Sequence, residues 1–187
     1  FCDILMGFLK PNQGKILINN KEIDIFENIE WFKKLSYAPP VPKLIEDGLK
    51  QNIFFQSKDV FDFNFLDQLV NLEFLDKNEI EKSTYHNNFS AGEMQRIGLA
   101  RALARKRPEF IILDEPTSAL DTLNRSSFIN NLHSFKKEKI IILITHDLEL
   151  LKTLDKIIVF EEGKMRIFDD FFDASSQSKE LNHLLNI

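Results

Sequence analysis

The sequence is poor in cysteine, in long apolar runs and in clustered basic residues. Its single cysteine, Cys2, excludes an internal disulfide and fits a reducing compartment. No run approaches the roughly 20 apolar residues that a membrane helix requires, so we do not expect this chain itself to span a bilayer. The formal net charge of −5 and the sequence pI of about 5.4, without a basic run, argue against nucleic acid as the main ligand.

The composition nevertheless supplies enough apolar material for one sizeable core. Hydrophobic residues make up 43% of the 187 residues, and 18 of them are phenylalanine, which suits a single domain. Residues 51–82 carry apolar residues at helical spacing, which indicates a helical insertion. Elsewhere strands and helices alternate, which predicts a parallel sheet with crossover helices. The predicted elements are a helix over 1–9, a hairpin from Lys15, a helix over 31–34, strands over 35–38, 110–113, 140–144 and 157–160, helices over 123–136 and 147–154, a hairpin turn over 161–164, and a helix at the C-terminal end.

Two adjacent carboxylates, Asp114 and Glu115, close the predicted strand 110–113. This strand is a short apolar run and is expected to be buried on both faces. An uncompensated charge at a buried strand end would cost several kcal/mol. Phosphate chemistry supplies a reason for the pair, because one carboxylate can hold Mg²⁺ while the other polarises an attacking water. The alternative, a strand that runs out into a solvated acidic turn, stays open on these residues alone.

Two other segments place polar residues where phosphate chemistry would use them. Ser90 and Glu93 form an S-x-x-E capping box, and the free N–H groups at such a helix start favour an anion. His146 follows the apolar strand 140–144. Taken singly, each residue is better explained structurally, Ser90 as a helix cap and His146 as a capped histidine at a strand end.

Taken in order, four segments resemble the motifs of the nucleotide-binding domain of ABC ATPases. They are the signature (Phe89–Arg96), the Walker B strand with its carboxylates (110–115), the D-loop (Ser118–Asp121) and the switch histidine (Thr145–Asp147). The resemblance spans essentially the whole chain. It implies a P-loop NTPase-type α/β fold, with a mostly parallel sheet, crossover helices and an inserted α-helical subdomain. The ATPase core would comprise residues 1–50 and 107–187, and the helical subdomain with the signature helix residues 51–106.

The resemblance also implies an ATP-hydrolysing site with ATP and Mg²⁺ as its cofactors. Two such domains would bind head to tail, so that each ATP is held by both chains. The residues implied are Asp114 for holding Mg²⁺ through water, Glu115 as the general base, His146 at the γ-phosphate, and Ser90, Gly92 and Asp121 at the ATP of the partner domain.

The sequence departs from the family pattern in several places. It contains no G-x-x-x-x-G-K-[ST] phosphate loop, and its first residues resemble the helix that follows this loop, so we expect an N-terminally truncated sequence.

Three residues also differ from the family's motifs. Ala91 replaces a glycine of the signature. Glu93 replaces a glutamine and adds a negative charge, which at about 7 Å and an effective dielectric of about 20 costs roughly 2 kcal/mol against phosphate. Pro40 stands where the Q-loop, here Tyr37–Ile53, has its Mg²⁺-binding glutamine.

The Q-loop segment also indicates the subfamily. Leu44–Ile45 followed by Gly48–Ile53 resembles the L-F-x-x-T-I-x-E-N-I segment of exporter-type domains, although residues 83–88 lack the loop common in exporters. The implied partners are a second ABC ATPase domain and a transmembrane domain fused upstream, and no nucleic acid. The implied location is the cytoplasmic face of the cell membrane.

Two alternatives remain beside the exporter hypothesis. The chain could be a soluble, non-transport ABC ATPase, although those proteins usually carry coiled-coil insertions or two such domains. It could also be a degenerate domain that binds nucleotide or a partner with little turnover, which Pro40, Ala91 and Glu93 favour and Glu115 and His146 oppose.

Overall fold

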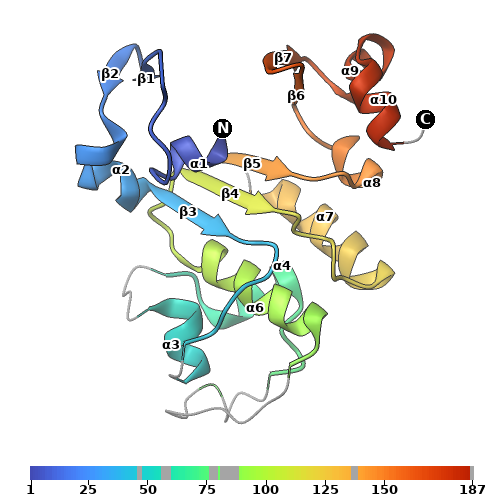
Figure 1. Ribbon diagram of the computed structural model, residues 1–187. Helices are drawn as coiled ribbons and strands as arrows, with labels where there is room; N and C mark the ends of the chain where they lie inside the picture. The colour runs from blue at the N-terminus through green and yellow to red at the C-terminus, as the bar shows by residue number, and fades with distance from the viewer. Residues whose placement is uncertain (46–47, 56–59, 76–79, 81–88, 136–138, 186–187) are drawn as a thin grey trace. The chain divides into compact units, whose positions relative to one another are not determined.

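The computed structural model describes residues 1–45, 48–55, 60–75, 80, 89–135 and 139–185 (Figure 1). The chain divides into two compact units, Phe1–Leu143 and Ile144–Ile187, which are taken in turn. Among the helices of the described residues, none combines the length and the apolar character needed to cross a membrane.

The first unit begins with a short helix and a hairpin. Helix α1 (Cys2–Leu5) ends well before the predicted Leu9, because Gly7 turns the chain at a φ of +73° and lies against the ring of Phe32. Strands β1 (Ile16–Ile18) and β2 (Lys21–Ile23) pair antiparallel, as predicted. Their turn uses positive φ angles of 50° and 62° at Asn19 and Asn20, which asparagine tolerates.

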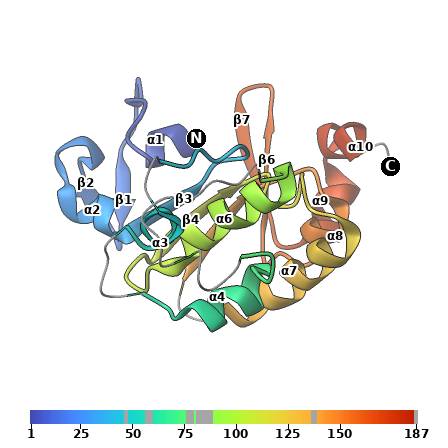
Figure 2. The same cartoon turned by 90° about the horizontal axis from the view of Figure 1, so that it is seen from below.

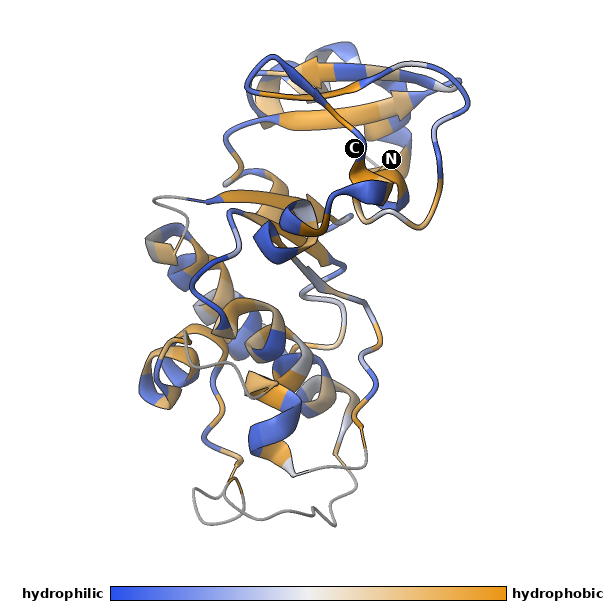
Figure 3. Ribbon diagram, turned by 90° about the vertical axis from the view of Figure 1, so that its left-hand side faces the viewer, coloured by the Kyte–Doolittle hydropathy of each residue, from blue (hydrophilic) through white to orange (hydrophobic). Residues whose placement is uncertain are grey.

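The sheet of the first unit has the strand order β3-β4-β5. Its strands are β3 (Leu35–Ala38), β4 (Phe110–Asp114) and β5 (Ile140–Ile144). Strands β3 and β4 run parallel, with Leu35 opposite Phe110 and Ala38 opposite Leu113, which confirms the predicted parallel pairing. The three residues before Asp114 are fully buried, so β4 is the covered strand that its apolar run predicts. The strands are predominantly apolar along their length (Figure 3).

Helix α6 (Ala91–Ala104) is the central helix of the first unit. It contacts β3 and β4 on one side and the helices α3 (Leu49–Phe54) and α4 (Phe63–Val70) on others (Figures 1 and 2). The first unit also contains the 3-10 helix η1 (Ile25–Glu27), α2 (Ile29–Lys34) and α7 (Thr122–Phe135), which packs on α4. Because α6 is enclosed on several sides, its buried positions are apolar or small with one exception, Gln95.

Side-chain hydrogen bonds fix the C-terminal half of α6. The hydroxyl of Ser36 on β3 donates a 2.7 Å hydrogen bond to the carbonyl of Ala102. The guanidinium of Arg101 donates to the carbonyls of Asn52 and Lys43 at 2.7 and 2.8 Å. Gly98 lies so close to Pro42 that a Cβ there would approach the proline ring to 2.6 Å. The Q-loop segment is therefore held along α6 by specific side chains.

The second unit has its own apolar core. Helix α8 (Leu148–Leu151), strands β6 (Ile157–Glu161) and β7 (Lys164–Phe168), and helices α9 (Phe171–Gln177) and α10 (Lys179–Leu185) enclose a cluster that includes Ile157, Phe168 and Leu181. Strand β6 pairs antiparallel with β7, which confirms the hairpin turn predicted over 161–164. Among the described strands β6 has no parallel partner, so the prediction that 157–160 continues the parallel sheet is wrong. The turn Glu161–Lys164 makes the hairpin, because Glu162 and Gly163 both adopt positive φ.

Candidate functional site

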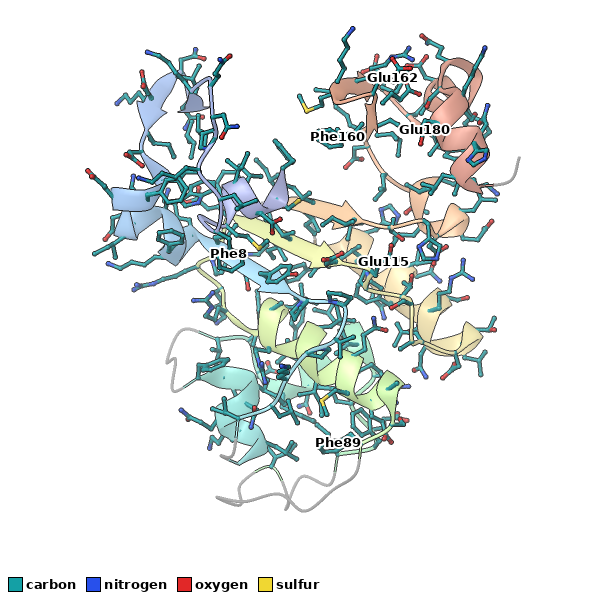
Figure 4. The ribbon with its side chains drawn as sticks, viewed as in Figure 1. Phe8, Phe89, Glu115, Phe160, Glu162 and Glu180 are labelled. Atoms are coloured by element: carbon teal, nitrogen blue, oxygen red, sulfur yellow. The ribbon has the colours of Figure 1, made fainter. Side chains whose placement is uncertain are left out.

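The two carboxylates predicted for phosphate chemistry lie at the end of β4. Asp114 is its last residue, and Glu115 follows directly (Figure 4). The parallel register brings Tyr37 of β3 beside this end, and its hydroxyl donates a 3.3 Å hydrogen bond to Oδ2 of Asp114. Burial, the charge of Asp114 and this hydrogen bond raise the pKa of Tyr37 to about 12. Tyr37 therefore stays protonated at neutral pH and remains a donor to the Asp114 carboxylate.

Glu115 adopts a backbone conformation that is rare for a residue with a side chain. Its φ is +47°, in the left-handed region. Its carbonyl oxygen accepts hydrogen bonds from Nε2 of Gln95 at 2.8 Å, from the hydroxyl of Ser118 at 3.0 Å and from the backbone N–H of Ser118 at 3.2 Å. These donors hold the backbone turn that begins at Glu115.

Gln95 is the buried polar residue at the centre of these contacts. Its side chain is 2% exposed. Besides Glu115, its Nε2 donates to the Ser118 hydroxyl at 3.0 Å, and its Oε1 accepts from the backbone N–H of Ala119 at 2.9 Å. The sequence analysis did not single out this residue. Gln95 lies between Met94 and Arg96, close to the charged Glu93, so no local pattern marked it as buried.

The capping box predicted at the start of α6 is confirmed. The Ser90 hydroxyl accepts from the N–H of Glu93 at 3.3 Å, while Oε2 of Glu93 accepts from the N–H of Ser90 at 2.8 Å. The N–H and then the hydroxyl of Ser90 lower the pKa of the Glu93 carboxyl. Ser90 itself is exposed, so the helix start presents this serine at the surface.

Gly92 has a structural role within the chain. A Cβ at this position would lie 2.7 Å from the carbonyl oxygen of Ala119 in the D-loop. That distance is too short for any side chain, so the first turn of α6 and the D-loop are in direct backbone contact. A glycine is required there whether or not the same residue also faces phosphate.

Asp121 lies at the end of the D-loop and holds the start of α7. Its Oδ1 accepts from the N–H groups of Leu123 and Asn124 at 3.0 Å each, and its Oδ2 accepts from the Asn124 side chain at 2.5 Å. The N–H of Asn124, then its side-chain amide, lower the pKa of Asp121. Oδ1 of Asn124 in turn accepts from Asn71 at 2.8 Å and from Arg96 at 3.4 Å. Arg96 of α6 thus contacts Asn124, which in turn donates to Asp121 of the D-loop.

The first unit therefore brings five of the six predicted site residues onto connected segments, the start of α6 and the chain from β4 to α7. His146 lies in the second unit, where it is exposed. The turn around it is ordered by its neighbours: the N–H of Asp147 donates to the Thr145 hydroxyl at 3.0 Å, and Asp147 caps α8. Its role at the γ-phosphate stays a prediction.

The Q-loop segment carries an exposed proline where the family's glutamine is expected. Pro40 follows β3 by two residues and has no side-chain oxygen. Residues 46–47 of this segment, and residues 83–88 before the signature, lie outside the described residues. Pro40 itself therefore offers no side-chain ligand to a metal, and the effect of this on hydrolysis stays a prediction.

The donor set at the end of β4 fits Mg²⁺. Among the described residues, no cluster of three or more histidine, cysteine, aspartate or glutamate side chains forms a dedicated metal cage. Magnesium does not require one, because it is usually held by one or two carboxylates together with water and substrate phosphates. Asp114, which accepts a hydrogen bond from the Tyr37 hydroxyl, provides such a carboxylate.

The chain is similar in sequence to known proteins. The sequence profile of the family described as ABC transporter matches residues 1–118. One relative is a Rickettsia typhi protein whose name describes it, provisionally, as an export ATP-binding/permease protein. It is 31% identical over 184 residues, which is 94% of this chain and 32% of the relative. ATP-dependent lipid A-core flippase 1 of Colwellia psychrerythraea is 32% identical over 169 residues, 87% of this chain and 28% of the relative.

A solved structure supports the fold. A bacterial Atm1-family ABC exporter with ATP bound superposes with a TM-score of 0.81 at 22% identity, covering 99% of this chain and 34% of that chain. This likeness confirms the predicted α/β fold class. The chain spans about a third of the length of the curated relatives it matches.

Proposed function

This chain belongs to the ABC transporter family, and we propose that it is the ATP-hydrolysing domain of an exporter. The observation that carries the proposal is the carboxylate pair at the end of buried β4. There Asp114 accepts from Tyr37, and Glu115 is turned out of the strand by donors to its carbonyl. Ordinary packing gives a buried strand no reason to end in this way, whereas phosphoryl transfer to water needs both a metal ligand and a base.

We assign the two carboxylates different tasks. Asp114 holds Mg²⁺ through water, and Tyr37 orients its carboxylate. When bound, Mg²⁺ neutralises charge on the phosphate oxygens. Glu115 orients the attacking water and accepts its proton. Consecutive side chains of a regular strand point to opposite faces of the sheet, and the left-handed backbone at Glu115 interrupts this alternation directly after Asp114.

A second copy of the domain, or a related one, completes each site. The first turn of α6 offers free N–H groups and the positive end of a 14-residue helix dipole. Ser90 and Gly92 at this turn would meet the γ-phosphate held by the partner domain, with Asp121 at the shared interface. His146 would contact the γ-phosphate held by its own chain. Support for this arrangement is the exposure of Ser90 and Asp121 and the backbone contact that joins their segments.

The coupling to transport rests on the relatives. Their names combine ATP-binding and permease parts in one protein, and this chain matches about a third of their length. We therefore propose that a transmembrane domain in the same polypeptide precedes this chain, and that the domain works at the cytoplasmic face of the membrane. Closure of two domains on ATP and reopening after hydrolysis would drive export.

The test is Mg²⁺-dependent ATP hydrolysis by the full-length protein beside its Glu115→Gln variant. Glu115→Gln preserves size but removes the base, so turnover should be abolished while ATP is still bound. Turnover near the wild-type rate in the variant would contradict the assignment. No turnover in either protein, with ATP bound by both, would favour the weakly hydrolysing alternative that Pro40 supports.

A further inference from the structure

The Gln95 side chain joins α6 to the two segments that carry the proposed base and the D-loop. One amide group makes three hydrogen bonds: Nε2 donates to the carbonyl of Glu115 and to the hydroxyl of Ser118, and Oε1 accepts from the N–H of Ala119. All three lie between 2.8 and 3.0 Å. Each partner is at least 20 residues away in the sequence, so these are tertiary contacts and not part of the helix itself.

Because Gln95 is buried, losing these hydrogen bonds would be costly. At 2% exposure the amide cannot exchange its partners for water, and an unpaired buried amide is costly. The side chain therefore fixes the relative position of its three partners. Two of them, the carbonyl of Glu115 and the N–H of Ala119, are backbone groups, so the amide constrains the chain path on both sides of Thr117.

The strained backbone of Glu115 links its hydrogen bond with Gln95 to hydrolysis. A positive φ at a residue with a side chain persists only where the surroundings hold it. Gln95 supplies the shortest of the hydrogen bonds to the Glu115 carbonyl, at 2.8 Å. Without this donor the Glu115 carbonyl keeps the Ser118 hydroxyl and N–H, at 3.0 and 3.2 Å. The peptide following Glu115 is then less firmly held, and the carboxylate shifts with it.

We propose that Gln95 is a positioning residue for ATP hydrolysis. Its amide holds the backbone of Glu115 in the turned conformation that aims the carboxylate at the attacking water, and it sets the D-loop against α6 through Ala119. The inference rests on the proposed role of Glu115 as the base. A small displacement of that base is expected to lower kcat about 10- to 100-fold while ATP binding is retained.

Two substitutions in the full-length protein test the inference. Gln95→Met keeps the length of the side chain but removes all three hydrogen bonds. Gln95→Glu keeps an acceptor for the N–H of Ala119 and replaces the donor with a carboxyl group, which can donate to the Glu115 carbonyl only when protonated. Burial and the neighbouring Glu115 both raise the pKa of such an introduced carboxyl. The activity of Gln95→Glu relative to wild type should therefore fall as the pH rises from 6 to 9.

The matched control is Ser36→Ala. It removes a buried side-chain-to-backbone hydrogen bond on the same helix, at Ala102, far along α6 from Gln95. Its melting temperature should fall, but its kcat should stay within about twofold of wild type. Gln95→Met should lower kcat about 10- to 100-fold with KM for ATP changed less than threefold.

The outcomes separate the inference from the proposed function. Loss of turnover in Glu115→Gln together with a wild-type kcat in Gln95→Met would overturn the positioning role alone. Turnover retained in Glu115→Gln would overturn the base assignment and this inference with it. If Gln95→Met does not fold, Gln95→Glu decides: a pH profile parallel to that of the wild type would contradict the role, and a relative loss with rising pH would support it.

Discussion

Gly92 lies so close to the backbone of Ala119 that an added Cβ would be 2.7 Å from the Ala119 carbonyl oxygen. Gly92→Ala should therefore destabilise the protein, although a glycine-to-alanine change inside a helix normally stabilises it by about 0.5–1 kcal/mol. Because the obstructing atom belongs to backbone, the first turn of α6 and the D-loop must separate, at a cost of about 1–3 kcal/mol. Thermal unfolding without nucleotide measures this effect independently of any phosphate contact.

Ala91→Gly is the matched control for that experiment. It makes the reverse change one position earlier on the same turn, at an exposed residue, and should cost only the intrinsic preference of about 0.5–1 kcal/mol. A melting temperature for Gly92→Ala equal to or above that of the wild type would contradict the close contact.

Tyr37→Phe should weaken Mg²⁺ binding at Asp114 and so raise the Mg²⁺ concentration that hydrolysis requires. The substitution keeps the ring but removes the hydroxyl that donates to Oδ2 of Asp114 at 3.3 Å. Loss of a hydrogen bond that orients a metal-binding carboxylate lowers metal affinity by about 10-fold at the mild end of the usual range, and this bond is a long one. The Mg²⁺ concentration for half-maximal hydrolysis should rise by up to about 10-fold.

The pH dependence of this variant provides a further check. The pKa of about 12 keeps Tyr37 protonated well above neutral pH, so the hydroxyl donates equally at pH 7 and pH 9. The ratio of Mg²⁺ requirements between variant and wild type should thus be the same at both pH values. A difference that disappears at pH 9 would show that the hydroxyl has already ionised.

Much of the first unit could be predicted because its signals are local. Strand β3 follows the predicted bounds, and β4 extends them by one residue, because short apolar runs end at Pro39 and at charged Asp114. The S-x-x-E spacing likewise predicted the capping box at Ser90. These features depend on residues within a few positions of each other, so a single sequence contains them in full.

The contacts of Gln95 could not be predicted in the same way. Its partners lie 20 to 24 residues further along the chain, and their approach depends on how α6 packs against the end of β4. The same holds for the early end of α1, where Gly7 turns the chain against Phe32. The hairpin turn after β6 could be predicted from its local residues, whereas the apolar run of β6 is equally compatible with a strand inside the parallel sheet and one outside it.

The capping box at the start of α6 should contribute stability that depends on pH. The N–H and hydroxyl of Ser90 lower the pKa of Glu93 from its ordinary value of 4.5. The stabilisation is therefore complete above pH 4.5 and is lost as the pH falls through the lowered pKa of the folded state. Hydrogen exchange of the first amides of α6 should be slower in wild type than in Glu93→Gln at pH 7, and the difference should shrink below pH 4.5. A difference that is constant across this range would show that the charge of Glu93 contributes nothing to the cap.

Pro40→Gln should restore an oxygen ligand near the metal site and raise turnover or Mg²⁺ affinity. The register that pairs Ala38 with Leu113 brings the chain after β3 beside the end of β4, where Asp114 lies. Pro40 is exposed, so a longer amide side chain can enter without displacing core residues.

Val41→Gln is the matched control, because it adds the same group to the next residue, which is 76% exposed. A gain in Mg²⁺ affinity with Pro40→Gln but not with Val41→Gln would identify a lost ligand. Equal behaviour of both variants and the wild type would mean that water already occupies that coordination position and that the proline does not limit hydrolysis.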